Sequence, residues 1–427
     1  MPLDPKEGLA EHSQFLGLRN TVPSDRFGLG DLEAASNVDI DDSGRVTRRK
    51  GYSVPVVIGM CKSLWSDGTT ALAVRSETNL VQIQPDFSVT TLRSNLAPVL
   101  DMAYTGVAQR VFYSNGVDTG VVQNGVSRTW GLVPPTGQPT AAATNGVLKG
   151  GTYQFAMTYL RHDKQESGTV AAGTIDITDN QGISLSAIPV SSDPDVASKV
   201  IYFSKRNGEM LFRVGLLAPN AGAFVYQMEA SMQVPLITQH LRPAPPGQIV
   251  DNLNGGRTLV ARGNVLYYSE PYSLELFDLR KNYTYPSRIT LVVGMNSGAY
   301  VGTADDVVWM DGTVPEKWTS TPKLSYGAIP GAVTVCSKDM VNAGAEGGRL
   351  MGEKGRLVAV FATTRGVCVG EDNGMIVNLT HERFLYPIQD KGAMLVRRHR
   401  GFVQGLVTLQ GAEIADDAIP TYRADIR

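Results

Sequence analysis

The sequence has few of the residues on which small secreted proteins and metal-dependent proteins rely. Its three cysteines, Cys61, Cys336 and Cys368, are far apart and show no CxxC spacing. This pattern predicts folding in a reducing compartment without a disulfide framework, with all three cysteines on buried strands. The five histidines show no HxH or HExxH spacing. We therefore expect neither a metal site nor a cofactor.

Long apolar runs and nucleotide-binding loops are also missing. No segment approaches the roughly 18 apolar residues of a membrane span, and the N-terminus lacks the basic and apolar regions of a signal peptide. No Gly-x-Ser-x-Gly elbow and no Gly-x-x-x-x-Gly-Lys-Ser/Thr loop occurs. With the usual signatures of catalysis absent, we expect a protein that is not an enzyme and has no membrane span.

Charge is scarce and almost balanced. Lysine and arginine total 39, aspartate and glutamate 41, and the net charge is −2. Tight non-specific DNA binding needs clustered cations, so a DNA partner would be contacted without strong retention. The 45 glycines and 23 prolines, with charged residues at 19%, instead favour many short strands joined by tight turns.

A loosely repeated unit of strand, polar turn and strand predicts the fold. Thr258–Ser269 matches Ala299–Met310, with Tyr268 corresponding to Trp309. Weaker copies run over 64–81, 102–113 and 367–376. A spacing of roughly 40 residues is typical of propeller blades. We expect an all-β protein with a β-propeller-like body of about five to seven blades, and a set of separate sandwiches remains the alternative.

The ends of the chain suggest how such a propeller would close. Gly401–Leu409 and Val38–Thr47 both read as strands, and propellers often join strands from the two termini. We expect these two segments to pair. Residues 1–34 are expected to form an N-terminal arm, 35–133 the first part of the propeller, 241–410 the second part, and 411–427 a polar surface tail.

The stretch 134–240 interrupts the repeated unit. Pro134–Pro139 and Arg242–Gly247 mark its boundaries, and an Ala/Thr run follows the first of them. Tyr153–Tyr159 alternates aromatic and polar residues as a half-exposed strand does. About six short strands in about 100 residues are typical of a small sandwich. We expect an inserted β-sandwich similar to a fibronectin type III domain, with one enlarged blade as the alternative.

Two turns partly match ligand-binding motifs. Asp39–Gly44 begins like a calcium loop, but Lys50 stands where the loop needs a bidentate glutamate, so a hairpin turn is favoured. Trp65–Thr70 is similar to the Asp-box turn of sialidase propellers. Only one such turn is visible, and a plain turn between strands is the better interpretation.

Two basic clusters lie near the two ends of the chain. If the terminal strands pair, both clusters lie on one blade and form a patch for an acidic partner or for passing DNA phosphates. Ordinary solvated strand ends are an equally good interpretation. The residues of this candidate patch are Arg45, Arg48, Arg49, Lys50, Arg397, Arg398 and Arg400.

The segment Asp31–Tyr52 carries a family resemblance. It runs from an acidic residue through small residues, Asn-Val and a hairpin to basic residues and Gly-Tyr. This order, with blade segments such as Gly263–Pro271 and Tyr300–Thr303, resembles the tail nozzle proteins of short-tailed phages, also called tail tubular or DNA-stabilisation proteins. The chain departs from longer members in its inserted sandwich and modest length, so their distal tip elaborations are not expected here.

The resemblance implies a structural virion protein of the phage tail, assembled in the host bacterial cytoplasm. Six copies would form a ring beneath the portal and adaptor, in contact with tail fibres or other tail proteins. Double-stranded DNA would pass through the ring without sequence-specific binding, since each fixed cation facing it adds drag. Ring closure uses heterologous interfaces, and Phe15, Leu16 and Phe27 of the arm are candidates for reaching across them.

A second function remains open. A carbohydrate-binding or glycan-cleaving propeller that reads the host surface would use aromatic blade ends as stacking platforms for sugars. Tyr267, Tyr268 and Trp309 are the candidates for that role.

Overall fold

The computed structural model describes residues 14–36, 38–40, 44–48, 58–98, 100–231, 233–342, 357–380, 383–386, 390–399, 402–410 and 421–424. Almost all of their regular structure is antiparallel strand. The helices in this part of the chain are one α-helix, α1 (Lys338–Asn342), and two short 3-10 turns, η1 (Ser24–Arg26) and η2 (Pro315–Lys317). The prediction of an all-β chain is confirmed.

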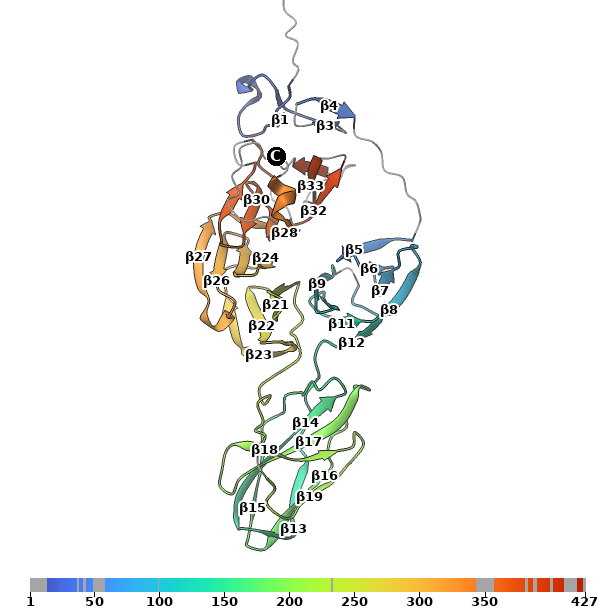
Figure 1. Ribbon diagram of the computed structural model, residues 1–427, viewed down its shortest axis with the longest axis vertical. Coiled ribbons are helices and arrows are strands. Elements are labelled where there is room, and N and C mark those ends of the chain that lie inside the picture. Colours follow the sequence, from blue (N-terminus) through green and yellow to red (C-terminus); the bar gives the residue numbers. More distant parts are fainter. Residues whose placement is uncertain are drawn as a thin grey trace, which may run out of the picture.

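Six sheets form the propeller-like body (Figure 1). In each of them the strands lie side by side in chain order, and the first five have four strands. The first contains β5 (Cys61–Ser66), β6 (Ala71–Arg75), β7 (Asn79–Ile83) and β8 (Val89–Arg93), and the second β9 (Ala103–Val107), β10 (Arg110–Ser114), β11 (Thr119–Gln123) and β12 (Val126–Arg128). The third contains β20 (Ile249–Leu253), β21 (Arg257–Arg262), β22 (Val265–Glu270) and β23 (Ser273–Thr284). The fourth contains β24 (Ile289–Gly294), β25 (Gly298–Thr303), β26 (Val307–Asp311) and β27 (Thr319–Leu324). The fifth contains β28 (Ala328–Ser337), β29 (Leu357–Thr363), β30 (Gly366–Glu371) and β31 (Ile376–Asn378), and the sixth β32 (Lys391–His399), β33 (Phe402–Gln410) and β34 (Thr421–Ala424).

Apolar cores lie between successive sheets. The first and second sheets share one core, and the same holds for each following pair up to the fifth and sixth. Leu72 of β6 and Val111 of β10, for example, belong to the core between the first two sheets. Lys391 of β32 also forms an ion pair of 3.0 Å with Asp101, just before β9. The sheets therefore pack face to face as the blades of a propeller do.

The two matched repeat units occupy equivalent places in neighbouring sheets. Thr258–Ser269 covers β21 and β22, and Ala299–Met310 covers β25 and β26. Leu259 lies opposite Tyr268 in one hairpin, as Tyr300 lies opposite Trp309 in the other. The weaker copies are hairpins at other positions in their sheets, such as β9 with β10. A strand-turn-strand pattern is found in every hairpin of a meander. The sequence alone therefore did not show which two strands of a sheet each repeat covers.

The expected pairing between the two ends of the chain was wrong. The strand β3 (Val38–Ile40) pairs with β4 (Val46–Arg48), and β33 pairs with β32 on one side and β34 on the other. Both edges of β33 are thus filled, which leaves no backbone groups for β3. The strand β34 lies within 411–427, so part of the expected surface tail instead completes the last sheet.

The residues between the second and third sheets form two sheets of their own, drawn in green below the propeller in Figure 1. One contains β13 (Thr140–Leu148), β16 (Gln181–Ser186) and β19 (Phe224–Tyr226). The other contains β15 (Gly173–Ile177), β14 (Gly151–Arg161), β17 (Val196–Ser204) and β18 (Leu211–Leu217). A single core that includes Phe155, Ile183 and Phe203 joins them. We call this unit the inserted sandwich.

The described part of the N-terminal arm lies against the chain that follows the fifth sheet. The strands β1 (Gly17–Leu18) and β2 (Asp31–Leu32) form a short parallel pair. The Asp31 carboxylate, 2% exposed, forms ion pairs with Arg19 at 2.9 Å and Arg383 at 2.7 Å. Asn20 exchanges two hydrogen bonds of 2.7 Å with the backbone of Leu385. The arm is therefore anchored on its own chain by polar contacts.

Candidate functional site

The structure divides the predicted basic patch between two separate sheets. Arg45 and Arg48 are exposed at the β3–β4 hairpin, whereas Arg398 is exposed on β32. Arg397 is half-buried and donates hydrogen bonds to Gln404 on the neighbouring strand. The strand pairing that would have joined the two clusters is absent from the described pairings. Arg49, Lys50 and Arg400 lie outside the described residues.

The candidate interface residues of the arm have mixed exposure. Phe15 and Phe27 are half-buried, and Leu16 is 46% exposed. The backbone N–H of Phe15 donates to the carbonyl of Gly44, which holds this part of the arm near the β3–β4 hairpin. A role of these residues between subunits stays a prediction.

The turns and aromatic residues considered as ligand sites have structural roles. Tyr268 and Trp309 are 5% and 2% exposed within cores between sheets, which leaves them no free face for a sugar, and Tyr267 is half-buried against a third core. Asp67 accepts three hydrogen bonds from Thr69 and Thr70 and so closes the turn between β5 and β6. Most of the Asp39–Gly44 turn lies outside the described residues. Among those described, no group of three or more His, Cys, Asp or Glu side chains is placed to hold a metal.

Cys61 corrects another expectation from the sequence. It lies on a strand, β5, but it is exposed, whereas Cys336 is half-buried and Cys368 is buried. Cys61 begins the first strand of its sheet, where the adjacent Met60 is also 87% exposed. The apolar character of cysteine therefore did not predict burial at this sheet end.

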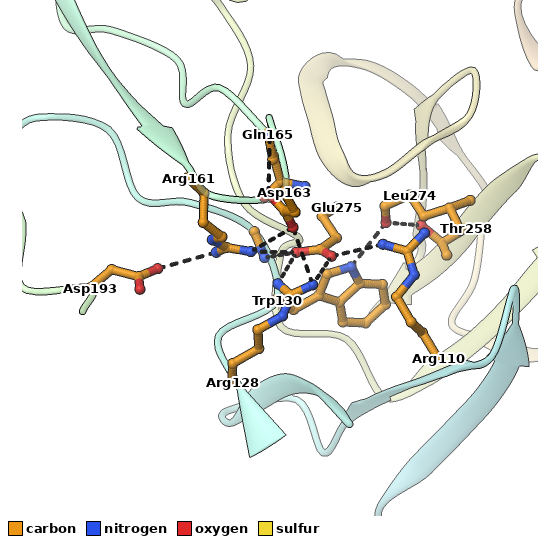
Figure 2. A network of polar contacts seen from close by, with 11 residues as sticks. Arg110, Arg128, Trp130, Arg161, Asp163, Gln165, Asp193, Thr258, Leu274 and Glu275 are labelled. Carbon is orange, nitrogen blue, oxygen red and sulfur yellow. Dashed lines mark hydrogen bonds and ion pairs between the residues drawn. The ribbon is translucent and has the colours of Figure 1, made fainter. Parts of the chain in front are cut away.

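A concentrated group of charges lies where the inserted sandwich meets the propeller (Figure 2). Glu275 of β23 has a side chain with 0% exposure. Arg128 of β12 donates two hydrogen bonds to its carboxylate, at 2.6 and 2.7 Å, and Arg110 of β10 donates one at 3.0 Å. Arg161, the last residue of β14 in the sandwich, donates a further one at 3.2 Å. One buried carboxylate thus joins two propeller sheets and the sandwich, and we call this group the Glu275 cluster.

Two further acidic residues balance the charge of the Glu275 cluster. Asp193 forms an ion pair of 3.2 Å with Arg161, and Asp163 lies 3.7 Å from Arg128 across the junction. Burial alone raises the pKa of Glu275, but hydrogen bonds and charges from the three arginines outweigh it. The result is a pKa below the ordinary value, so Glu275 is ionised at neutral pH.

The chain between propeller and sandwich is anchored on both sides of the junction. Trp130, 1% exposed, packs between Phe112 and Phe277 in the propeller and donates from Nε1 to the carbonyl of Leu274 at 3.0 Å. Leu132, 0% exposed, belongs to the core of the sandwich. Gly131, between them, has φ of +93° and donates its N–H to Glu275 at 3.2 Å. A side chain there would meet the backbone of residues 243 and 275, so only glycine fits this position.

A second acidic side chain joins the first strands of three consecutive sheets. Asp251 of β20 accepts hydrogen bonds from Thr105 of β9 at 3.3 Å, from its neighbour Asn252 at 2.8 Å and from the N–H of Gly294 at the end of β24 at 2.9 Å. All three donors are neutral. Burial is the dominant effect and raises the pKa of Asp251 to about 6, with the hydrogen bonds opposing it.

Sequence reasoning missed both acidic sites. Glu275 is flanked by Leu274 and Leu276, and a charge between apolar residues is the local signal that could have indicated a buried ion pair. Its partners are remote in sequence, since Arg110 and Glu275 are 165 positions apart. No local spacing links them.

Comparison with known proteins gives no family. No model of a known protein family and no curated protein matches the chain. Among solved structures, BBS1N in complex with ARL6DN is similar with a TM-score of 0.32 and 12% identity over 82% of this chain and 90% of that chain. The N-terminal domain of Nup159 has a TM-score of 0.29 and 11% identity over 86% and 77% of the two chains. Apo AztD from Citrobacter koseri has a TM-score of 0.27 and 10% identity over 76% and 88%.

Similarity at these TM-scores carries no argument about function. The propeller-like fold stands on the chain's own strand pairing and on the cores between its sheets. In the part of the chain that the structure describes, no helix has the length and apolar character needed to cross a bilayer.

Proposed function

We propose that this protein is a structural component of a phage tail. In this proposal, copies of the chain form a ring, six to the ring as the resemblance implies, below the portal and adaptor. The ring encloses the DNA channel, retains packaged DNA and passes it during ejection. The protein acts without catalysis or cofactor, and its partners are itself, the adaptor, other tail proteins and the passing DNA.

The observation that carries the proposal is the N-terminal segment that resembles the tail nozzle family. Its first acidic residue, Asp31, has a side chain with 2% exposure that forms ion pairs with Arg19 of the arm and Arg383 near the fifth sheet. The start of the resembling segment is thus anchored on the fold, and the strands β3 and β4 lie beside the propeller (Figure 1). The exposed strand β4 beside a propeller-like body is a suitable contact for a neighbouring ring component.

The distribution of charge supports a channel protein. The net charge is −2, and several arginines are used in ion pairs inside the protein. Arg110, Arg128 and Arg161 bind Glu275, and Arg257 binds Glu316 at 3.0 Å. Cations neutralised in this way add little phosphate retention to a wall that faces DNA.

The strand count supports a fibronectin type III-like identity for the inserted sandwich, as part of the same proposal. Seven strands in sheets of three and four, around one core, are suited to that class of domain. In a tail ring, such a domain would extend away from the propeller toward other tail proteins.

The proposal is tested by assembly. We expect the purified protein to add to the portal–adaptor complex of its phage and to give six-fold rings by electron microscopy. Mass photometry of the mixture supplies the stoichiometry. A protein that stays monomeric at high concentration and does not associate with that complex would contradict the proposal.

A pair of arm variants sharpens the test. Asp31→Ala removes both ion pairs of the buried carboxylate and should release the arm, so adaptor binding should weaken. Asp25→Ala changes an exposed aspartate in the same arm, in η1, and should leave binding unchanged. Equal adaptor binding by both variants would show that the arm anchor has no part in assembly.

A further inference from the structure

We infer that the inserted sandwich is a rigid extension of the propeller, held at one orientation by the Glu275 cluster and by chain connections anchored on both sides. Domains joined through small interfaces ordinarily move relative to each other. The contacts at this junction argue for the opposite behaviour. The inference does not depend on the proposed function.

Charged hydrogen bonds set the orientation. Arg161 reaches from the sandwich to Glu275 with one nitrogen and to Asp193 with another, both at 3.2 Å, and it is 2% exposed. Arg128, on the propeller side, donates hydrogen bonds to the same carboxylate from two nitrogens. Hydrogen bonds between a guanidinium and a carboxylate have strict geometry. A rotation of the sandwich would therefore break Arg161 away from a carboxylate that the propeller holds fixed.

The first connection between the propeller and the inserted sandwich is very short. Trp130 lies in a propeller core and Leu132 in the sandwich core, with a single residue between them. Each is at most 1% exposed. A swinging motion would have to withdraw one of these side chains from its core.

The second connection is anchored in the same way. Thr238 donates from Oγ1 to the carbonyl of Ser167 in the sandwich at 2.8 Å. Arg242 and Phe277 exchange two backbone hydrogen bonds of 2.8 and 2.9 Å, which fix the returning chain to β23. Ala244 then enters the propeller core that contains Trp130. Two anchored connections and a central ion cluster together leave no free hinge among the described residues of the junction.

Distance measurement between two spin labels tests this inference. Cys61 is exposed on the first sheet and serves as the propeller label, and Glu209→Cys adds an exposed label on the sandwich. Cys336→Ser removes the half-buried thiol from this background. Pulsed electron spin resonance on the full chain should give one narrow distance distribution.

Variants locate the cause of the rigidity. Glu275→Gln leaves three arginines without their shared carboxylate and should broaden the distance distribution about twofold. Arg161→Met removes only the bond from the sandwich and should broaden it in the same direction. If Glu275→Gln does not fold, Arg161→Met answers the question, because Glu275 keeps its two propeller partners.

A matched control separates rigidity from stability. Glu371→Gln weakens the buried ion pair between Glu371 and Lys338, which lies wholly within the fifth sheet and the adjoining α1 helix. It should lower stability and leave the distance distribution as narrow as before. The inference fails if the labelled chain without further substitutions already gives a broad distance distribution. It also fails if folded Glu275→Gln and Arg161→Met both give distributions as narrow as that of the control.

Discussion

Glu275 is a buried and Asp251 a half-buried acidic side chain, and their pKa values move in opposite directions. Glu275 lies at the junction of propeller and sandwich and is surrounded by three arginines. Asp251 lies where the first strands of three sheets meet and has only neutral donors. The pKa of Glu275 falls below its ordinary value, whereas that of Asp251 rises to about 6.

The comparison shows that the partners of a buried carboxyl, and not its burial alone, decide its charge. Burial raises the pKa in both cases. Three guanidiniums reverse the effect at Glu275, while neutral hydrogen bonds only reduce it at Asp251. Glu275 can therefore hold two units together as an anion at neutral pH, whereas Asp251 changes its charge near pH 6.

Removal of the Glu275 charge should have the largest effect. Glu275→Gln leaves buried guanidiniums without a counter-charge, and we expect a loss of about 3 to 5 kcal/mol in the free energy of unfolding. Urea denaturation at pH 7 measures it. Glu209→Gln, at an exposed position of the sandwich, is the control and should change stability very little. A loss below that of a typical surface substitution would mean that the cluster is not a structural centre.

The two acidic groups should give opposite pH dependences. The folded pKa of Asp251 is raised from 3.8 to about 6. Its contribution to the free energy of unfolding is therefore complete below about pH 4, and about 3 kcal/mol is lost as the pH rises to 6. The folded pKa of Glu275 is lowered from 4.5. Its contribution to the free energy of unfolding is therefore present above pH 4.5 and is lost as the pH falls below 4.5 through the lowered pKa. Thermal unfolding of the protein between pH 3 and 7 measures both.

Variants assign the two pH effects. Asp251→Asn should remove the change between pH 4 and 6, and Glu275→Gln should remove the part of the acid loss that comes from Glu275. An unchanged pH profile in Asp251→Asn would show that another group titrates there.

Gly131→Ala tests how closely the backbone is packed at the junction of propeller and sandwich. The added Cβ would lie 2.5 Å from the carbonyl oxygen of residue 275, and φ is +93°. We expect a loss of about 2 kcal/mol, measured by urea denaturation. Gly125→Ala is the control, because Gly125 also has positive φ, at +74°, but a Cβ there would only make an ordinary contact of 3.7 Å with the Gln82 side chain. If Gly131→Ala lowers the free energy of unfolding no more than Gly125→Ala does, the backbone at the junction can shift to accommodate a side chain.

Thr105→Val should have the smallest effect. It removes one neutral donor to Asp251 and the acceptor of a hydrogen bond from the Asn252 side chain. We expect a loss of about 1 kcal/mol and a further rise in the pKa of Asp251. Thr290→Val, which removes a buried hydroxyl, is the matched control, because that hydroxyl donates to the backbone carbonyl of Thr303 and not to an acidic side chain. Both variants should lose similar stability at pH 7, but only Thr105→Val should move the pH profile.

The sequence by itself determined the class of structure and the approximate extent of its parts. Alternation in segments such as Tyr153–Tyr159, polar turns and glycine-rich spacing are local properties, and local properties specify strands and hairpins. The interruption after Pro134 likewise marked where the inserted sandwich begins. These features need no knowledge of distant residues.

Tertiary structure decided the pairing and the polar sites. The Ala/Thr run within Thr140–Leu148 became strand β13 because β16 supplied its hydrogen bonds, although alanine has low strand preference. β33 paired with β34 and not with β3, because nearby partners filled both of its edges. The Glu275 cluster draws on residues up to 165 positions apart. Such contacts exist only once separate cores have formed, since each charge is stable in the interior only when its partners are already in place.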